Sequence, residues 1–168
     1  NFAEWEAQGK MILLFAMFVG GSAGSTGGGI KVIRWLVTIK AIRRELYTTA
    51  RPDVVQPVKL GGSVVDEDAV RGILVFTVLY FVLMGISAVF LELDSARIGY
   101  QISTFEAFSA ALATIGNIGP GFGAVGPFGS YLEFSPVSKL WMTFLMWIGR
   151  LEIVPVLALF VITLEDGS

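Results

Sequence analysis

Cysteine and histidine are absent from the 168 residues of the chain, and only 15% of the residues are charged. Without cysteine, the chain has no disulfides, thiolate nucleophiles or cysteine-based zinc sites. Without histidine, it lacks the most common metal ligand and the side chain that most often moves protons near neutral pH. Metal and acid–base chemistry are therefore disfavoured, and we expect a protein that is not an enzyme.

The low charge content also separates the chain from water-soluble proteins, which average about 25% charged residues. Hydrophobic residues make up 54% of the sequence, a composition typical of integral proteins of the lipid bilayer. The formal net charge of −2 gives no general attraction to nucleic acid. The chain begins Asn-Phe-Ala-Glu-Trp, without the basic segment and cleavage site of a signal peptide. We expect it to be part of a longer polypeptide.

One apolar run, residues 69–93, is long enough to cross a bilayer as a helix. It contains only two charged side chains, Arg71 and Glu92, and both lie near its ends. At 1.5 Å per residue, a helix of this length crosses a hydrocarbon core of about 30 Å with some tilt. The run therefore predicts a transmembrane helix.

A second predicted span covers residues 136–164. It begins with Ser135 as the N-cap and Pro136 in the first helical position. Arg150 lies near its midpoint, where a charge costs about 2.5–3.5 kcal/mol in lipid. We expect Arg150 to face a cavity or a polar partner, either beside an ion path or in a structural contact.

Glycine interrupts the first helical segment of the chain. Residues 20–29 include six glycines, and each costs about 1 kcal/mol relative to alanine inside a helix. We therefore predict a discontinuous helix over residues 1–50, with a Gly/Ser/Thr loop between its halves. Such a loop is tolerated at membrane depth only where protein buries it or where it lines a wet cavity. The loop is therefore a candidate for backbone that lines a pore or a site.

A shorter helix and a second glycine-rich loop lie between the two spans. The Ser-x-x-Glu pattern from Ser103 to Glu106 predicts a capping box, and the helix over 104–114 is about 16 Å long, half of a bilayer. The glycines and the proline of the loop 115–123 end this helix. The chain must then return to the side from which it came, because the next helix needs the full membrane thickness. Residues 69–168 thus form a predicted membrane–pore-loop–membrane unit.

Charge placement predicts the orientation. Eight of the twelve basic residues lie between Lys31 and Arg71, so the positive-inside rule places residues 31–68, including the connection 51–68, in the cytoplasm. The pore loop then enters from outside, and the C-terminal end of the chain is cytoplasmic. The basic stretch either docks a cytoplasmic partner or anchors at anionic headgroups. The prediction is an all-α, multi-pass integral protein of the cell membrane.

The loop after the short helix has the spacing of a potassium-channel filter strand, over Asn117, Ile118, Gly119, Pro120 and Gly121. In such a strand, successive backbone carbonyls replace the water around a cation, and glycine adopts conformations that are costly for other residues. The half-helix before it directs the negative end of its dipole toward the site. The simpler alternative is a Gly/Pro turn that joins a short helix to a span.

Three segments taken together resemble the membrane subunit of the Trk/Ktr potassium-uptake family, of the TrkH type. They are residues 20–34, residues 117–121 and the sequence Gly-Arg-Leu-Glu-Ile at 149–153. The resemblance implies four membrane–pore-loop–membrane repeats in one polypeptide. This chain would then hold the second helix of the third repeat (1–50) and the complete fourth repeat (69–168), a partial potassium-channel-like architecture.

The resemblance also implies roles for individual residues. The family's intramembrane gate loop would comprise Gly24, Ser25, Thr26, Gly27, Gly28, Gly29 and Lys31. Residues 117–121 would be the fourth filter strand and the only metal site, binding potassium through carbonyl oxygens, although Pro120 replaces the aromatic residue of the channel strand. Arg150 would project toward the conduction path.

The implied partners are the other repeats, a second copy of the complete chain and a cytoplasmic nucleotide-binding regulatory subunit, with no cofactor besides the transported potassium ion. We therefore expect uptake of potassium, or another monovalent cation, through a carbonyl-lined pore and past a Gly-rich gate. One alternative is a secondary transporter that binds a solute or sodium at the broken helix. Another is a membrane enzyme or scaffold whose loops serve only packing. The half-helix followed by Asn-Ile-Gly-Pro-Gly favours the pore.

Overall fold

The computed structural model describes residues 5–21, 29–51 and 57–151. Within them lie five α-helices: α1 (Ala7–Val19), α2 (Val32–Ala50), α3 (Glu67–Arg97), α4 (Thr104–Ile115) and α5 (Pro136–Leu151). Two short 3-10 helices, η2 (Gly123–Val125) and η3 (Tyr131–Glu133), lie between α4 and α5. The fold is thus mostly helical, as expected.

A small hairpin departs from the all-α expectation. Strands β1 (Lys59–Leu60) and β2 (Ser63–Val64) pair antiparallel in the connection between α2 and α3. Gly61 and Gly62 form the two-residue turn with φ angles of 57° and 90°, which glycine adopts without steric cost.

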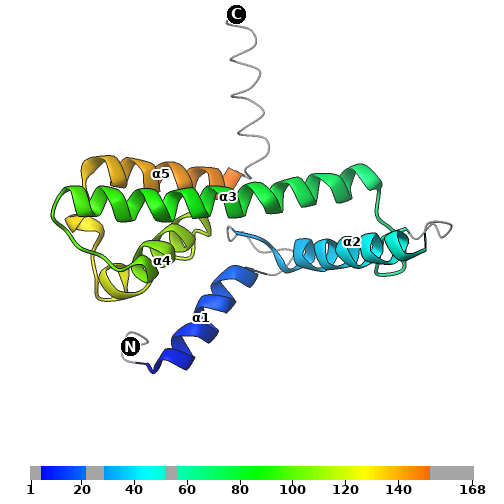
Figure 1. The fold of residues 1–168 in the computed structure, drawn as a ribbon, viewed down its shortest axis with the longest axis horizontal. Coiled ribbons are helices and arrows are strands. Elements are labelled where there is room, and N and C mark those ends of the chain that lie inside the picture. The colour runs from blue at the N-terminus through cyan, green and yellow to red at the C-terminus, as the bar shows by residue number, and fades with distance from the viewer. Residues whose placement is uncertain (1–4, 22–28, 52–56, 152–168) are drawn as a thin grey trace, which may run out of the picture.

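Helix α3 is the longest element, and α2, α4 and α5 pack along it. Figure 1 shows α4 and α5 beside one half of α3 and α2 beside the other half. Among the described helices, α3 is the one long and apolar enough to cross a membrane. It extends past the run 69–93 at both ends. Acidic Glu67 and Asp68 in its first turn and Arg97 in its last turn suit the helix dipole there.

Helix α4 lies under α3 and α5 and is almost completely buried beyond its first turn. Its capping box is confirmed: the Ser103 hydroxyl accepts from the Glu106 N–H, and the Glu106 carboxylate accepts from the Ser103 N–H. The buried face is rich in small residues, Ala107, Ala110, Ala111 and Ala113. Small side chains let α3 and α5 approach the α4 backbone closely, so α4 is held between them.

Helix α5 begins at Pro136, as expected. The Ser138 N–H donates to the Ser135 hydroxyl at 3.0 Å, which confirms Ser135 as the N-cap. The remainder of the predicted span, residues 152–164, lies outside the described residues.

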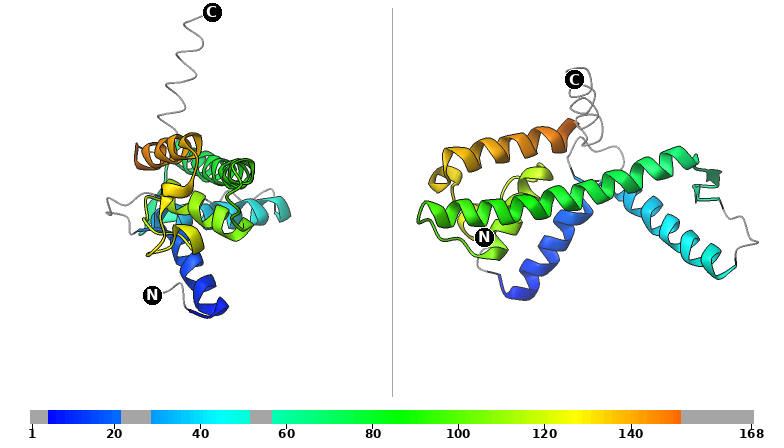
Figure 2. Two further views of the ribbon diagram at one scale, coloured as in Figure 1. Left: turned by 90° about the vertical axis from the view of Figure 1, so that its left-hand side faces the viewer. Right: turned by 45° about the horizontal axis from the view of Figure 1, so that its top comes forward.

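Helices α1 and α2 diverge from a common region near the middle of α3 (Figure 2). Helix α1 ends at Val19 and is capped by Gly20, which has a φ of 71°. The Val32 N–H at the start of α2 donates to the Gly21 carbonyl at 3.1 Å. The indole N–H of Trp35 donates to the Phe18 carbonyl at 3.2 Å. The two ends of the glycine-rich stretch therefore meet, and residues 22–28 between them lie outside the described residues.

Candidate functional site

Helix α4 ends in a Schellman motif that leads the chain into the predicted filter strand. The Asn117 N–H donates to the Thr114 carbonyl at 3.1 Å, and the Ile118 N–H donates to the Ala113 carbonyl at 3.0 Å. Asn117 has a φ of 49°, a left-handed conformation that asparagine tolerates better than most residues. The motif satisfies the last helix carbonyls, so the chain leaves the helix sharply at Ile118.

The predicted strand then presents free carbonyl oxygens. Ile118, Gly119 and Pro120 are exposed. The carbonyl oxygens of Asn117, Ile118, Pro120 and Gly121 accept no hydrogen bond from any residue that the structure describes. Free, exposed peptide oxygens after a half-helix can coordinate a cation that has lost its water.

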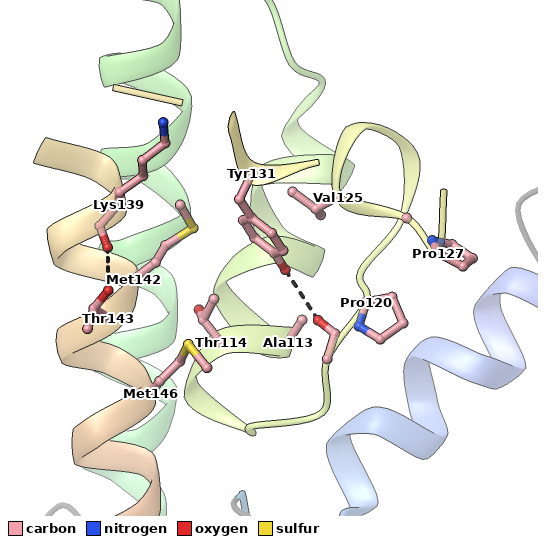
Figure 3. A pocket seen from close by; sticks show the side chains of 12 residues that line it. Ala113, Thr114, Pro120, Val125, Pro127, Tyr131, Lys139, Met142, Thr143 and Met146 are labelled. Carbon is pink, nitrogen blue, oxygen red and sulfur yellow. Dashed lines mark hydrogen bonds between the residues drawn. The ribbon is translucent and has the colours of Figure 1, made fainter. Parts of the chain in front are cut away.

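Gly119 differs from its neighbours in the strand. Its carbonyl accepts a hydrogen bond from the Tyr131 hydroxyl at 3.2 Å (Figure 3), so the expectation of five bare oxygens fails at this position. The reason is tertiary, because η3 folds back over the strand and places the phenol there. Burial raises the pKa of Tyr131, so the hydroxyl stays protonated and can donate. The φ of Gly119 is 114°, which strains any residue with a side chain.

Cavities border the strand on two sides. One of about 590 Å³ lies between α4, the strand and α5; its lining residues, drawn in Figure 3, include Thr114, Gly119, Pro120, Tyr131 and Met146. A second cavity, of about 360 Å³, separates the end of α1 from the start of the strand. It is lined by Leu13, Ala16, Met17, Gly20, Gly21, Gly116, Asn117 and Ile118. The strand thus faces open space toward both α5 and α1.

Two contacts fix the start of the strand to α5. The side-chain amide of Asn117 donates to the Met146 carbonyl at 2.9 Å. A Cβ on Gly149 would overlap the carbonyl oxygen of Ile115. The sequence marks Gly149 only as a neighbour of Arg150, and its packing role was missed. A glycine inside an otherwise apolar helix is the signal that would have indicated close approach.

The structure describes only some of the predicted gate residues. Gly24, Ser25, Thr26, Gly27 and Gly28 lie outside the described residues.

The other two gate residues, Gly29 and Lys31, are described. Gly29 is buried with a φ of 82°, and a Cβ there would lie 3.6 Å from the Gly116 Cα and from the Tyr80 hydroxyl. Lys31 is half-buried directly before α2. One end of the predicted gate thus touches the turn that precedes the filter strand.

Arg150 lies in the last described turn of α5. Its side chain is exposed and makes no hydrogen bond or ion pair with any other residue in the described ranges. It directly follows Gly149, the residue that contacts the end of α4. Arg150 is therefore the sequence neighbour of a residue that packs on the end of α4. It forms no hydrogen bond or ion pair with the described strand residues.

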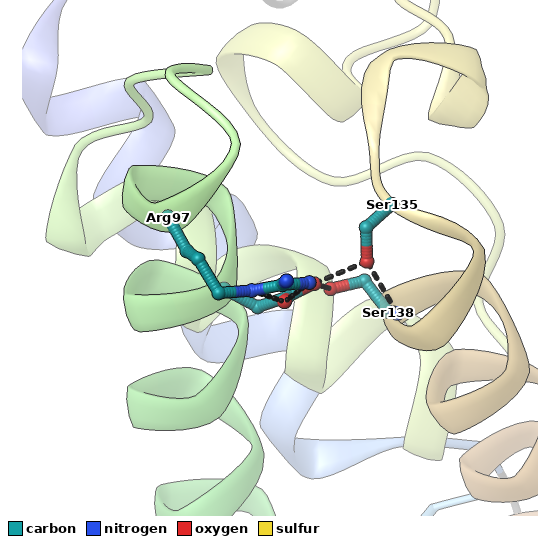
Figure 4. Close-up of polar contacts among 4 residues, drawn as sticks. Arg97, Ser135 and Ser138 are labelled. Carbon is teal, nitrogen blue, oxygen red and sulfur yellow. Dashed lines mark hydrogen bonds and ion pairs between the residues drawn. The ribbon is translucent and has the colours of Figure 1, made fainter.

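A buried carboxylate joins the C-terminal end of α3 to the start of α5 (Figure 4). Asp94 accepts hydrogen bonds from the Ser135 hydroxyl, from the Ser138 hydroxyl at 2.6 Å and from Arg97 at 2.7 Å. These bonds from Ser135, Ser138 and Arg97 lower the pKa of Asp94 to about 2, so the carboxylate stays ionised. Sequence analysis assigned no role to Asp94. The predicted N-cap at Ser135 was the nearest signal.

Known proteins are similar to this chain in sequence and in structure. The family model TrkH, described as a cation transport protein, matches residues 1–168. The Trk system potassium uptake protein TrkH of Escherichia coli (strain K12) is 36% identical over 160 residues, which cover 95% of this chain and 32% of that protein. TrkG of the same strain is 34% identical over 160 residues, covering 95% of this chain and 31% of that protein.

A solved structure also matches. The crystal structure of the potassium transporter TrkH from Vibrio parahaemolyticus superimposes with a TM-score of 0.74 at 35% sequence identity. The match covers 94% of this chain and 32% of that one. The chain spans about a third of the length of the curated relatives that it matches.

Proposed function

This chain belongs to the TrkH family of cation transport proteins, and from that premise we propose that the complete protein takes up potassium across the cell membrane. The relatives are named potassium uptake proteins, so the family is one of membrane transporters and not of enzymes. Potassium is the transported ion in this proposal, and no other cofactor is needed.

The single observation that carries the proposal is the strand that follows α4. Its carbonyls at Asn117, Ile118, Pro120 and Gly121 accept no hydrogen bond within the described residues, and they lie at the negative end of a half-helix dipole. In the proposed pore, this is one of four strands from four repeats in one polypeptide. Together the strands replace the hydration shell of potassium. The alternative of a simple Gly/Pro turn gives no reason for four free carbonyls among five consecutive residues.

We propose the glycine-rich stretch 20–29 as the gate. Its described ends meet each other, and Gly29 lies against Gly116. The cavity of about 360 Å³ beside Gly20 and Gly21 also borders Asn117 and Ile118, so an ion that leaves the strand would enter it next to the gate. Arg150 would add positive charge near this exit.

The topology and the partners belong to the same proposal. Residues 1–50 are the second helix of the third repeat and 69–168 are the fourth repeat, with residues 31–68 and the C-terminal end in the cytoplasm. Basic residues support the cytoplasmic placement of residues 31–68. Four of them line a cavity of about 410 Å³ beside α2 and the hairpin: Lys40, Arg43, Arg44 and Lys59. We propose a dimer of complete chains and a cytoplasmic nucleotide-binding regulatory subunit.

Substitution of Gly119 tests the filter. Gly119→Ser in the complete protein should reduce the preference for potassium over sodium about tenfold, because a φ of 114° strains a side-chain-bearing residue by about 1–2 kcal/mol and displaces the adjacent carbonyls. The measurement is rubidium uptake into liposomes with sodium as competitor.

Gly99→Ser is the matched control for this test. Gly99 also has a positive φ, 78°, with open space around it, but it lies in the turn after α3. This control should keep the wild-type preference. Equal preference in Gly119→Ser and wild type, or a wild-type protein that does not prefer potassium, rejects the proposed filter.

A further inference from the structure

Three polar side chains at the start of α4 share one face and hold the segment that follows the predicted filter strand. We name Ser103, Glu106 and Ser109 the α4 clamp. The Phe122 N–H donates to the Ser109 hydroxyl oxygen at 3.0 Å, and the Ala124 N–H donates to Oε1 of Glu106 at 2.9 Å. Oε2 of Glu106 accepts from the N–H of Ser103 at 2.8 Å and from its hydroxyl at 2.9 Å. The carboxylate therefore joins the N-cap of α4 to the loop beyond the strand.

These bonds decide which way the outer strand carbonyls point. In a trans peptide, the carbonyl of one residue points opposite to the N–H of the next residue. Because the Phe122 N–H points at Ser109, the Gly121 carbonyl points away from α4. The Gly121 N–H donates to the Val125 carbonyl at 2.8 Å. By the same geometry, the Pro120 carbonyl points away from Val125. Ser109 thus fixes the Gly121 carbonyl directly. Glu106 acts one step further away: it holds Ala124, the neighbour of Val125, whose carbonyl orients the Pro120–Gly121 peptide.

Glycines let the clamp lie directly against the loop backbone. A Cβ on Gly123, whose φ is 60°, would overlap the Glu106 carboxylate, and a Cβ on Gly121 would lie 3.0 Å from the Ser109 hydroxyl oxygen. Burial raises the pKa of Glu106, but the N–H groups of Ser103 and Ala124 lower it to a net value below the usual range. The carboxylate is therefore ionised and accepts strongly.

We propose that Glu106, assisted by Ser109, is a positioning residue for ion discrimination, which orients the outer filter carbonyls without touching the ion. This inference rests on the proposed filter function. A coordinating ring discriminates potassium from the smaller sodium ion through the number and placement of its carbonyl oxygens. A loose outer strand can close around sodium. Loss of the clamp therefore weakens the preference for potassium more than it weakens transport.

The test is rubidium uptake, with sodium as competitor, by the complete protein in liposomes. Glu106→Ala should lower the preference for potassium over sodium about tenfold, the value of roughly one charged hydrogen bond. Glu106→Gln keeps an oxygen for the Ala124 N–H but sets an amide N–H against the Ser103 N–H, so its preference should fall between those of Glu106→Ala and wild type. Maximal rubidium uptake should change less than the preference.

Glu133→Ala is the matched control, because Glu133 is an exposed acid in the same loop region and makes no side-chain hydrogen bond to any described residue. It removes the same charge and should keep the preference. Ser109→Ala removes one loop contact with little change in volume, and it should also lower the preference. This variant provides the test if Glu106→Ala fails to fold. Unchanged preference in both clamp variants, or an equal loss in Glu133→Ala, overturns the proposal. A wild-type protein without potassium preference would instead reject the filter itself.

Discussion

Helices α3, α4 and α5 form one region and helices α1 and α2 form a second, and the two regions are held in different ways. In the first region, α4 is buried between α3 and α5, and buried polar groups such as Asp94 join the helix ends. In the second region, α1 and α2 meet each other mainly around Gly20 and Ile30. Their outer faces carry large exposed apolar side chains; Phe15 of α1 is 71% exposed and Leu46 of α2 is 69% exposed.

The difference separates a densely packed part of the site from a less densely packed part. The geometry of the predicted filter strand depends on contacts that α4 and α5 make within the first region. Helices α1 and α2 contribute fewer residues to that core: Met17 of α1 joins it, and Val37 and Ala41 of α2 pack with Val70 of α3 in a second, smaller cluster. In the proposed function, the densely packed region holds the filter strand and the less densely packed region holds the gate.

Gly149 gives the largest expected effect and tests how tight the first region is. Gly149→Ala places a Cβ onto the Ile115 carbonyl oxygen, so α5 must move away from α4 at a cost of about 3 kcal/mol. Gly72→Ala is the control, since Gly72 lies in α3 with open space around it and alanine favours a helix by about 1 kcal/mol. Thermal unfolding in detergent should show a midpoint below that of wild type for Gly149→Ala but not for Gly72→Ala. Equal midpoints for the two variants would show that this contact is not tight.

Asp94 gives an intermediate effect. Asp94→Asn weakens the bonds to Ser135, Ser138 and Arg97 and should cost about 1–2 kcal/mol in unfolding free energy. The folded pKa of about 2 lies below the ordinary value of 3.8. The carboxylate therefore stabilises the fold fully above pH 3.8, and this contribution is lost as the pH falls toward 2. Unfolding measured across this pH window should show a loss in wild type that Asp94→Asn lacks.

The ion pair of Arg44 with Glu67 is the counterpart in the loosely held region and serves as the control for Asp94. It joins α2 to α3 at 2.7 Å, with a half-buried Arg44 side chain and an exposed Glu67 side chain. Exposed pairs contribute little and are screened by salt, so Arg44→Gln should leave the unfolding midpoint nearly unchanged. A loss as large as that of Asp94→Asn would contradict the distinction between the two regions.

Shortening the gate loop has the smallest expected effect on stability. Deletion of residues 25–27 should leave the unfolding midpoint within the range of the control variants but raise rubidium flux about fivefold, if it removes about 1 kcal/mol from the barrier. A loop of unchanged length with Ser25→Gly and Thr26→Gly should keep the parental flux. Flux at or below the parental value in the deletion variant rejects the gate.

Local signals in the sequence predicted the helices that lie at the site. The apolar run 69–93 falls within α3, and the Ser-x-x-Glu pattern marks the start of α4 because a capping box needs only neighbouring residues. Ser135 and Pro136 mark the start of α5 in the same way.

Contacts between distant segments were not predictable. Asp94 and Ser138 are 44 residues apart, and the contact of Gly149 with Ile115 depends on the packing of two helices. The bond from Tyr131 to Gly119 likewise depends on how η3 folds back over the strand. The hairpin of β1 and β2 was missed because strands of two residues are too short to show an alternating pattern.

The side chain of Asn117 has a mechanical consequence. One residue ends α4 through its backbone and is tied to the Met146 carbonyl of α5 through its amide. A tilt of the lower part of α5 therefore pulls directly on the first peptide of the strand. Rearrangement of that helix would therefore reach the backbone of the predicted filter strand through this hydrogen bond, beside the packing of Gly149 on Ile115.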